Sequence, residues 1–343
     1  MVAENLFTFS FKKLPKAFLI CLVLIIGANA IVIHLVDNDI LEISPYRHEY
    51  RYQLEQAQNK RADVVIIGDS SALYINTEIL KNALFTNSQA QILNLSVGGA
   101  MPRTFSYILN NADYQCVNDN GLVIFCLRPM DFNRYNICFE RTMISYFSWK
   151  EFFSELVAEK RMDDVRYFLQ KCSLYLINYR FEIKAVIKRY INENIIRVQA
   201  VKKKKARKVR IIKPEYDKEH AKRKEVTMML YKNNFIDQYT LDEYQIRHMN
   251  MIIGELKQRN IRVVLVIMPV SSAFMRVVGM KDLKLFRNKI RDVSSEQSID
   301  LLDFLSGSKG DEFRYFDGMH FIRESEIKFS QILSVNIRKI LNK

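Results

Sequence analysis

The stretch from Ala62 to Ala72, ADVVIIGDSSA, limits the possible folds more than any other part of this chain. Its four consecutive aliphatic residues, between a charge and a glycine, are typical of a strand buried in a parallel sheet. Gly68 ends the strand, and Ser70 and Ser71 follow at its carboxyl end, where open α/β sheets place their sites. A helix over Leu73 to Leu84 is expected next, with its first amides directed towards the group that the serine attacks.

Short apolar runs recur along the chain and alternate with stretches that suit helices. Four more strands are expected, at Ile92 to Leu95, Leu122 to Leu127, Ile261 to Met268 and Asp300 to Phe304. An amphipathic helix from Arg323 to Leu341 is expected after them. Because the strands alternate with crossover helices, the pattern predicts an α/β fold with a doubly wound parallel sheet.

Residues 17–36 form an apolar run of twenty residues without a formal charge. A helix of that length measures about 30 Å, the thickness of the hydrocarbon core of a bilayer. Three lysines lie just before the run and three acidic residues just after it, so a transmembrane helix with a cytoplasmic N-terminus is expected. Two alternatives stay open, a signal peptide cleaved after Ala30 and a helix buried in the core. The transmembrane interpretation places the catalytic domain outside the cytoplasm.

The expected sheet domain is divided by a helical, basic insertion in which strand patterns are absent. The predicted organisation is a cytoplasmic N-terminus (1–16), a transmembrane helix (17–36), a connector (37–61), the first part of the sheet domain (62–148), the insertion (149–259) and the second part of the sheet domain (260–343).

The positive charge of the chain is concentrated in that insertion. Residues 202–224 hold twelve Lys or Arg and three acidic residues, a local charge of +9 out of a total of +14. Such a segment is most often a solvated face or a loop, and the main alternative is contact with an anionic lipid or polymer. No nucleic-acid partner is expected, because the predicted orientation removes the segment from nucleic acid. The five cysteines show no metal-type spacing, and no metal or cofactor is expected.

Asp317 and His320 supply the two groups that a serine nucleophile needs. An imidazole takes the proton from the serine, and a carboxylate fixes the tautomer of that imidazole. The carboxyl edge of the sheet can bring both residues to Ser70, and amides of Ser70 and of the Gly98-Gly99 turn are candidate donors to an oxyanion. Plainer alternatives are a helix-capping Ser70, a turn-forming Asp317 and a hydrogen-bonded loop His320.

Together these residues resemble the SGNH (GDSL-like) hydrolase superfamily. Its nucleophile block G-D-S matches Gly68-Asp69-Ser70, and its last block D-x-x-H matches Asp317 to His320. Its second block resembles Asn94 to Gly99, with Gly99 at the position of the oxyanion glycine. The resemblance implies a three-layer α/β/α, flavodoxin-like fold, with Ser70 as the nucleophile, His320 as the general base and then acid, and Asp317 as its orienting partner.

The third block departs from the family pattern G-x-N-D. Leu127 to Phe132, LRPMDF, contains no asparagine, so the third oxyanion donor of the family is absent. Arg128 either pairs with Asp131 or meets an anionic substrate. A proline in this block and Pro269 after a later strand resemble a membrane-anchored branch, which includes proteins of teichoic-acid D-alanylation and, more distantly, of alginate O-acetylation.

That branch implies an acyltransferase or esterase that acts through a serine acyl-enzyme on O-acyl groups of a cell-surface glycan or glycolipid. Its expected partner is a membrane-bound O-acyltransferase, and no cofactor is implied. The altered third block keeps a second interpretation open. This is an inactive accessory protein with the same fold that binds a glycan or docks an acyltransferase.

Overall fold

The structure is a computed structural model. It describes residues 45–85, 89–134, 162–173, 239–305 and 312–342, together with the single positions 20, 23, 24, 27, 28, 30, 31, 153 and 157. The chain divides into two units, of which one comprises 46–146 and 209–343 and the other 1–45 and 147–208. Helix α7 (Met162–Ser173) belongs to the second unit, and the sheet with its helices forms the first.

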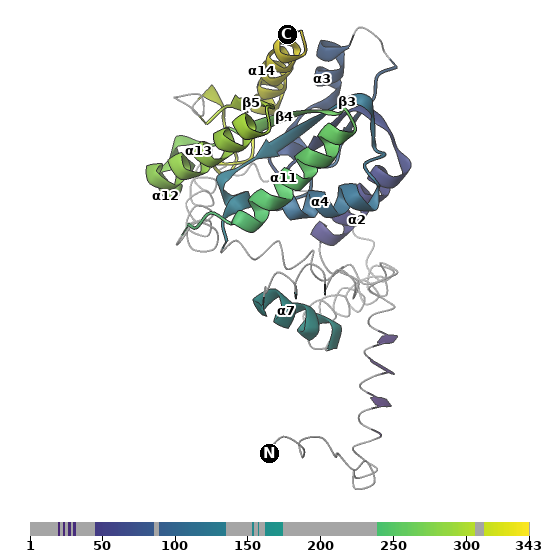
Figure 1. Ribbon diagram of the computed structural model, residues 1–343. Helices are drawn as coiled ribbons and strands as arrows, with labels where there is room; N and C mark the ends of the chain where they lie inside the picture. Colours follow the sequence, from purple (N-terminus) through teal and green to yellow (C-terminus); the bar gives the residue numbers. More distant parts are fainter. Residues whose placement is uncertain are drawn as a thin grey trace, which may run out of the picture. The chain divides into compact units, whose positions relative to one another are not determined.

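Five parallel strands form the centre of the first unit, in the order β2-β1-β3-β4-β5 (Figure 1). The predicted α/β fold with a parallel sheet is therefore confirmed. This strand order is one of the common doubly wound orders, and it reverses between β1 and β3, where such sheets form a crevice at the carboxyl ends. The strands are β1 (Ala62–Ile67), β2 (Ile92–Asn94), β3 (Val117–Leu127), β4 (Arg262–Ile267) and β5 (Asp300–Asp303).

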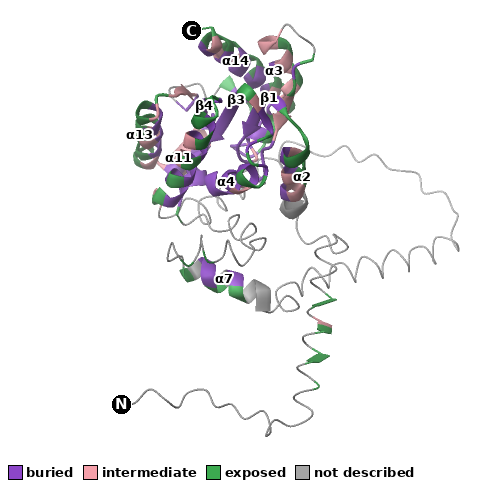
Figure 2. Ribbon diagram, turned by 45° about the vertical axis from the view of Figure 1, so that its right-hand side comes forward, coloured by how far each residue is buried: buried purple, intermediate pink, exposed green. Residues whose placement is uncertain are grey.

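Each face of the sheet is covered by helices because alternate aliphatic residues of each strand point to opposite faces. Ile66, Ile124 and Val266 belong to a core shared with Leu80 and Phe329. The last two lie on α3 (Thr77–Leu84) and α14 (Arg323–Leu341), which also contact each other. On Figure 2 the central strands β1, β3 and β4 are mostly buried, whereas the residues of the edge strands β2 and β5 are partly exposed.

The other face is covered by α4 (Pro102–Asn111) and α11 (Glu243–Gln258), which contact each other; α11 also contacts β4. Met249, Ile252 and Ile253 of α11 are fully buried. This helix lies within the insertion predicted at 149–259, yet the structure packs it on the sheet. The predicted boundary at residue 259 lies where strand patterns return in the sequence. Helix α11 precedes β4 and has no strand pattern of its own, so it falls on the insertion side of that boundary.

The helix expected over Leu73 to Leu84 is wrong at its start. Ala72–Tyr74 forms a single 3₁₀ turn, and the α-helix begins at Thr77. The side chain of Asn76 caps it by accepting a hydrogen bond from the Ile79 amide at 3.1 Å. The cap therefore uses the Ile79 amide, and the first amides of α3 do not lie directly after Ser70.

The connector before β1 is a helix, α2 (Pro45–Asn59), and its Tyr50, Gln53 and Ala57 are buried. Most of the predicted transmembrane segment 17–36 and all of the basic segment 202–224 lie outside the described residues. Among the residues that are described, no helix is both long and apolar enough to cross a bilayer.

Candidate active site

The turn after β1 leaves Ser70 partly exposed and buries Ser71. A Cβ at Gly68 would lie 2.7 Å from the Cβ atoms of both Ala72 and Cys126, so only glycine fits where the chain leaves the sheet. The Asp69 carboxylate accepts hydrogen bonds from the Ser71 amide at 2.9 Å and from the Ser71 hydroxyl at 2.7 Å. Ser71 is therefore occupied in holding the turn, and Ser70, which is half-buried, is the serine that faces the site.

Ser70, His320 and Asp317 form a continuous hydrogen-bonded chain. The Ser70 Oγ lies 2.7 Å from His320 Nε2, across 250 residues of sequence. On the other side of the ring, His320 Nδ1 lies 2.6 Å from Asp317 Oδ2. A carboxylate at Nδ1 favours the tautomer with the proton on Nδ1, which leaves Nε2 to accept the proton of the serine. The three residues named from the sequence are thus brought together.

The loop that carries Asp317 and His320 is fixed from within. Asp317 Oδ1 accepts hydrogen bonds from the amides of Met319 and His320 at 3.1 and 2.9 Å. An isolated antiparallel bridge between Tyr315 and Phe321 closes the loop at its base. The carbonyl of Gly318 accepts a hydrogen bond from the Ser271 amide at 3.0 Å, which ties the loop to the turn after β4. The orientation of the imidazole therefore depends on backbone contacts as well as on its side-chain partners.

These contacts change the acidity of Asp317. Burial alone would raise the pKa of this carboxyl, but the hydrogen bonds and charge of His320 and the two backbone amides lower the pKa to about 2. Because the unfolded-state pKa is about 4, the folded protein gains stability from the carboxylate above that pH and loses it as pH falls towards 2.

We expect the free energy of unfolding to fall by about 2 kcal/mol between pH 4 and pH 2 through this group. Urea unfolding of the wild type and of Asp317→Asn across that range measures the effect. The variant should lack this part of the pH dependence, and identical slopes for the two proteins would contradict it.

Arg128 follows β3 and reaches the same turn from the neighbouring strand. Its guanidinium forms an ion pair with Asp69, and both side chains are 1% exposed. Its Nη2 also donates a hydrogen bond to Ser70 Oγ at 3.3 Å. The Arg128 amide donates to the Asp131 carboxylate at 2.8 Å. Burial raises the pKa of Asp131, and Arg128 offsets part of that rise. A cation is thereby held against the candidate nucleophile.

We expect Arg128→Met to destabilise the fold by about 3–5 kcal/mol, because it leaves the Asp69 carboxylate buried without its partner. Urea denaturation measures this loss. Arg314→Met is the matched control, since the Arg314–Glu324 pair is about 80% exposed on both sides and its removal should cost about 0.5 kcal/mol or less. Equal losses of unfolding free energy in the two variants would show that burial does not make the Arg128–Asp69 pair more important for stability than an exposed pair.

The turn after β2 carries the candidate oxyanion glycines. Gly99 has a φ of +66°, which favours glycine, and its amide donates no hydrogen bond within the described part of the chain. The same holds for the Ser70 amide. The Gly98 amide, in contrast, donates to the Glu49 carboxylate at 3.0 Å. Gly99 and Ser70 are therefore available as donors, whereas Gly98 is engaged unless Glu49 moves.

Helix α2 contributes site residues that the sequence analysis missed. Glu49 binds the Gly98 amide, and Gln53, one helical turn later, donates to the carbonyl of Ser96 at 3.1 Å. Burial raises the pKa of Glu49. Outside α2, Tyr74 of the 3₁₀ turn after β1 also lies beside the triad, with its ring centroid 5.8 Å from that of His320. The spacing of Glu49 and Gln53 by four residues was the signal available, since it places both on one face of a helix.

No group of three or more His, Cys, Asp or Glu side chains is placed to hold a metal ion in the described ranges. Cys116 and Cys126 are buried free thiols, and burial raises the pKa of both.

Fold and site together define the class: an α/β protein with a Ser–His–Asp constellation at the carboxyl edge of a parallel sheet. The chain belongs to a family described as proteins of unknown function, DUF1574, whose model matches residues 43–324. No curated protein matches it in sequence. Among solved structures, it is similar to a Bacteroides fragilis protein described as a candidate acylhydrolase, at 11% identity and a TM-score of 0.41, over 85% of this chain and 96% of that chain.

Proposed function

We propose that this protein is a serine-dependent acyltransferase or esterase that forms an acyl-enzyme at Ser70. The observation that carries the proposal is the chain of contacts from Ser70 Oγ through both ring nitrogens of His320 to Asp317, at 2.7 and 2.6 Å. A nucleophile and a base within hydrogen-bond reach, with the base oriented by a carboxylate, is the arrangement that acyl transfer requires. Ser70 and His320 are both partly exposed, which leaves this arrangement accessible to a substrate.

The reaction proceeds in two balanced steps. In the first, Ser70 Oγ bonds to the ester carbonyl carbon while His320 Nε2 takes the hydroxyl proton. The carbon–oxygen bond to the leaving group then breaks, and His320 gives that proton to the departing alkoxide. In the second, His320 takes a proton from an acceptor hydroxyl or from water, whose oxygen bonds to the acyl carbon. The bond from that carbon to Ser70 Oγ then breaks, and His320 returns the proton to Ser70 Oγ. Asp317 stays ionised and holds the imidazolium that forms in each step.

The tetrahedral intermediate requires hydrogen-bond donors for its oxyanion. The amides of Ser70 and Gly99 are candidates, and Arg128 Nη2 already donates to Ser70 Oγ at 3.3 Å. Arg128 thus supplies a donor in the segment that lacks the asparagine of the SGNH pattern. A buried guanidinium provides a full charge, so its contribution in a site of low dielectric is large.

The setting that we propose follows from the SGNH resemblance and from residues 17–36. The chain is anchored by a single transmembrane helix, and its catalytic domain lies outside the cytoplasmic membrane. Its substrates are O-acyl groups of a cell-surface glycan or glycolipid, delivered by a membrane-bound O-acyltransferase. Support comes from the uncharged run of twenty residues and its flanking charges, which predict this orientation.

Covalent labelling tests the proposed activity. A fluorophosphonate probe reacts with an activated serine, so peptide mass spectrometry of the labelled wild type should place the adduct on Ser70. Ser71→Ala is the matched control and should still be labelled, because the Ser71 hydroxyl bonds to Asp69 rather than to His320. An adduct that persists in Ser70→Ala, or a wild type that is never labelled, would contradict the proposal.

The second candidate function is a non-catalytic accessory protein that binds a glycan or docks an acyltransferase. The contact of the Glu49 carboxylate with Gly98 favours it, because a negative charge beside the oxyanion turn opposes an oxyanion. Glu49→Ala separates the two candidates. An enzyme should then hydrolyse a neutral aryl ester about tenfold faster than before, since the repelling charge is gone. An accessory protein should show no turnover in either form.

A further inference from the structure

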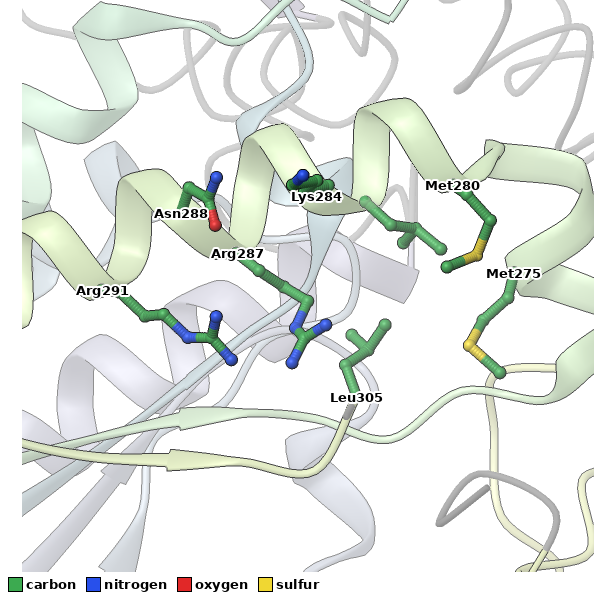
Figure 3. A pocket seen from close by; sticks show the side chains of 8 residues that line it. Met275, Met280, Lys284, Arg287, Asn288, Arg291 and Leu305 are labelled. Carbon is green, nitrogen blue, oxygen red and sulfur yellow. The ribbon is translucent and has the colours of Figure 1, made fainter. Parts of the chain in front are cut away.

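A second candidate binding site lies at the far end of the sheet from Ser70. A cavity of about 280 Å³ is formed between α12 (Ser272–Val278), α13 (Met280–Glu296) and the residues after β5 (Figure 3). This volume lies just below the range of about 300 to 1,000 Å³ typical of ligand pockets, so only a small ligand fits. β1 and β5 are separated by β3 and β4, three strand spacings or about 14 Å, so the cavity is distinct from the triad.

One wall of the cavity is cationic. Arg287 donates to Asp303 Oδ2 through Nε at 2.9 Å and Nη2 at 2.7 Å, and Arg291 Nη2 donates to the same oxygen at 2.9 Å. Lys284, a third lining cation, has no ion pair with any described residue. Among the described residues, the lining holds three cations, and two of them bind the one carboxylate of Asp303, which leaves an excess of two positive charges. The two arginines are held in place by Asp303, so they are pre-organised to bind an anion.

The opposite end of the cavity is apolar. Figure 3 shows the thioethers of Met275 and Met280 together at one end and the Arg291 side chain at the other, with Arg287 between them. Leu305, which is buried, closes the apolar end from the side of β5. Methionine adapts its shape to apolar ligands of different outline. The cavity therefore pairs an excess of positive charge with an adaptable apolar surface.

We propose that this cavity binds an amphiphilic anion, with a carboxylate or phosphate on Lys284 and Arg291 and a short acyl or alkyl chain on Met275, Met280 and Leu305. The assignment is independent of the chemistry proposed for Ser70. A purely structural role for the cluster would require only the bonds between the arginines and Asp303. Such a role would not require Lys284, Met275 or Met280.

Titration calorimetry of the full chain tests the ligand class with octanoate, octyl phosphate, octan-1-ol and inorganic phosphate. The two amphiphilic anions should bind saturably with 1:1 stoichiometry, and the neutral alcohol and inorganic phosphate should bind at least about tenfold more weakly, because each lacks one half of the ligand. The stronger of the two anions identifies the head group. Equal binding of octanoate and octan-1-ol, or no saturable binding of either anion, would overturn the proposal.

Variants at exposed positions locate the binding. Lys284→Gln with Arg291→Gln should raise the Kd of the preferred anion at least about tenfold, whereas Lys281→Gln, on the same helix but outside the cavity, should change it less than about twofold. In protein labelled with ¹³C at the methionine methyls, the anion should shift the Met275 and Met280 resonances, assigned through Met→Leu variants. Binding that the double variant leaves unchanged, or shifts confined to other methionines, would place the ligand elsewhere and refute the assignment.

Discussion

Ser70→Ala is expected to lower kcat/KM for an activated ester such as p-nitrophenyl acetate by about 10⁵- to 10⁶-fold, to the level set by the remaining site. The reason is that no other hydroxyl lies against His320 Nε2 among the described residues, since Ser71 is turned inward to Asp69. Steady-state hydrolysis by purified wild type and variant measures the loss.

The control for this prediction is Ser71→Ala, which removes an adjacent hydroxyl of the same kind. It should keep activity within about tenfold of the wild type, because the Ser71 hydroxyl supports the turn without touching the imidazole. Comparable losses in the two variants would indicate that the turn, rather than the Ser70 nucleophile, had been damaged.

Asp317→Asn is expected to lower kcat by about 10³- to 10⁴-fold without unfolding the protein. An asparagine oxygen still accepts from the amides of Met319 and His320, so the loop is kept. Its amide nitrogen, placed against His320 Nδ1, donates where the carboxylate accepted, and it drives the imidazole proton onto Nε2. In that tautomer His320 cannot take the proton of Ser70.

Circular dichroism and urea unfolding at pH 7 show whether the Asp317→Asn fold is intact, and ester hydrolysis gives the rate. If the folded Asp317→Asn variant retained the rate of the wild type, Asp317 would not be needed to orient the His320 imidazole. The proposed catalytic residues would then be Ser70 and His320 alone.

The triad could be predicted from the sequence because its members stand at positions that the topology fixes. Ser70 follows a strand recognisable by its four aliphatic residues, and Asp317 and His320 precede an amphipathic helix that the structure places at Arg323–Leu341 as predicted. In a doubly wound sheet such positions converge at one edge. The spacing of Asp317 and His320 also matches a turn in which the carboxylate bonds to its own loop.

Other contacts between separate elements could not be predicted from the sequence. The pairing of Arg128 with Asp69 depends on β3 lying beside β1, and the sequence offered Asp131, three residues away, as a nearer partner. Glu49 reaches Gly98 only because α2 packs beside the turn after β2. The α-helix starts at Thr77 rather than at Leu73 because the side chain of Asn76 caps it there, although helix-compatible residues continue from Leu73.

In the proposed mechanism, Arg128 takes the place of the asparagine that the third block of the SGNH pattern would supply. The third block lacks an asparagine, yet the guanidinium of Arg128 lies 3.3 Å from Ser70 Oγ. It brings charge that an amide lacks, and that charge is held in a buried ion pair.

The central claim is that Ser70 carries the acyl group, and trapping that intermediate tests it most directly. Protein mixed with p-nitrophenyl acetate and quenched in acid within seconds should gain the mass of one acetyl group, and peptide mass spectrometry should place that group on Ser70. The gain should disappear in His320→Ala. An acetyl group found on other residues, or found equally in both proteins, would contradict the account.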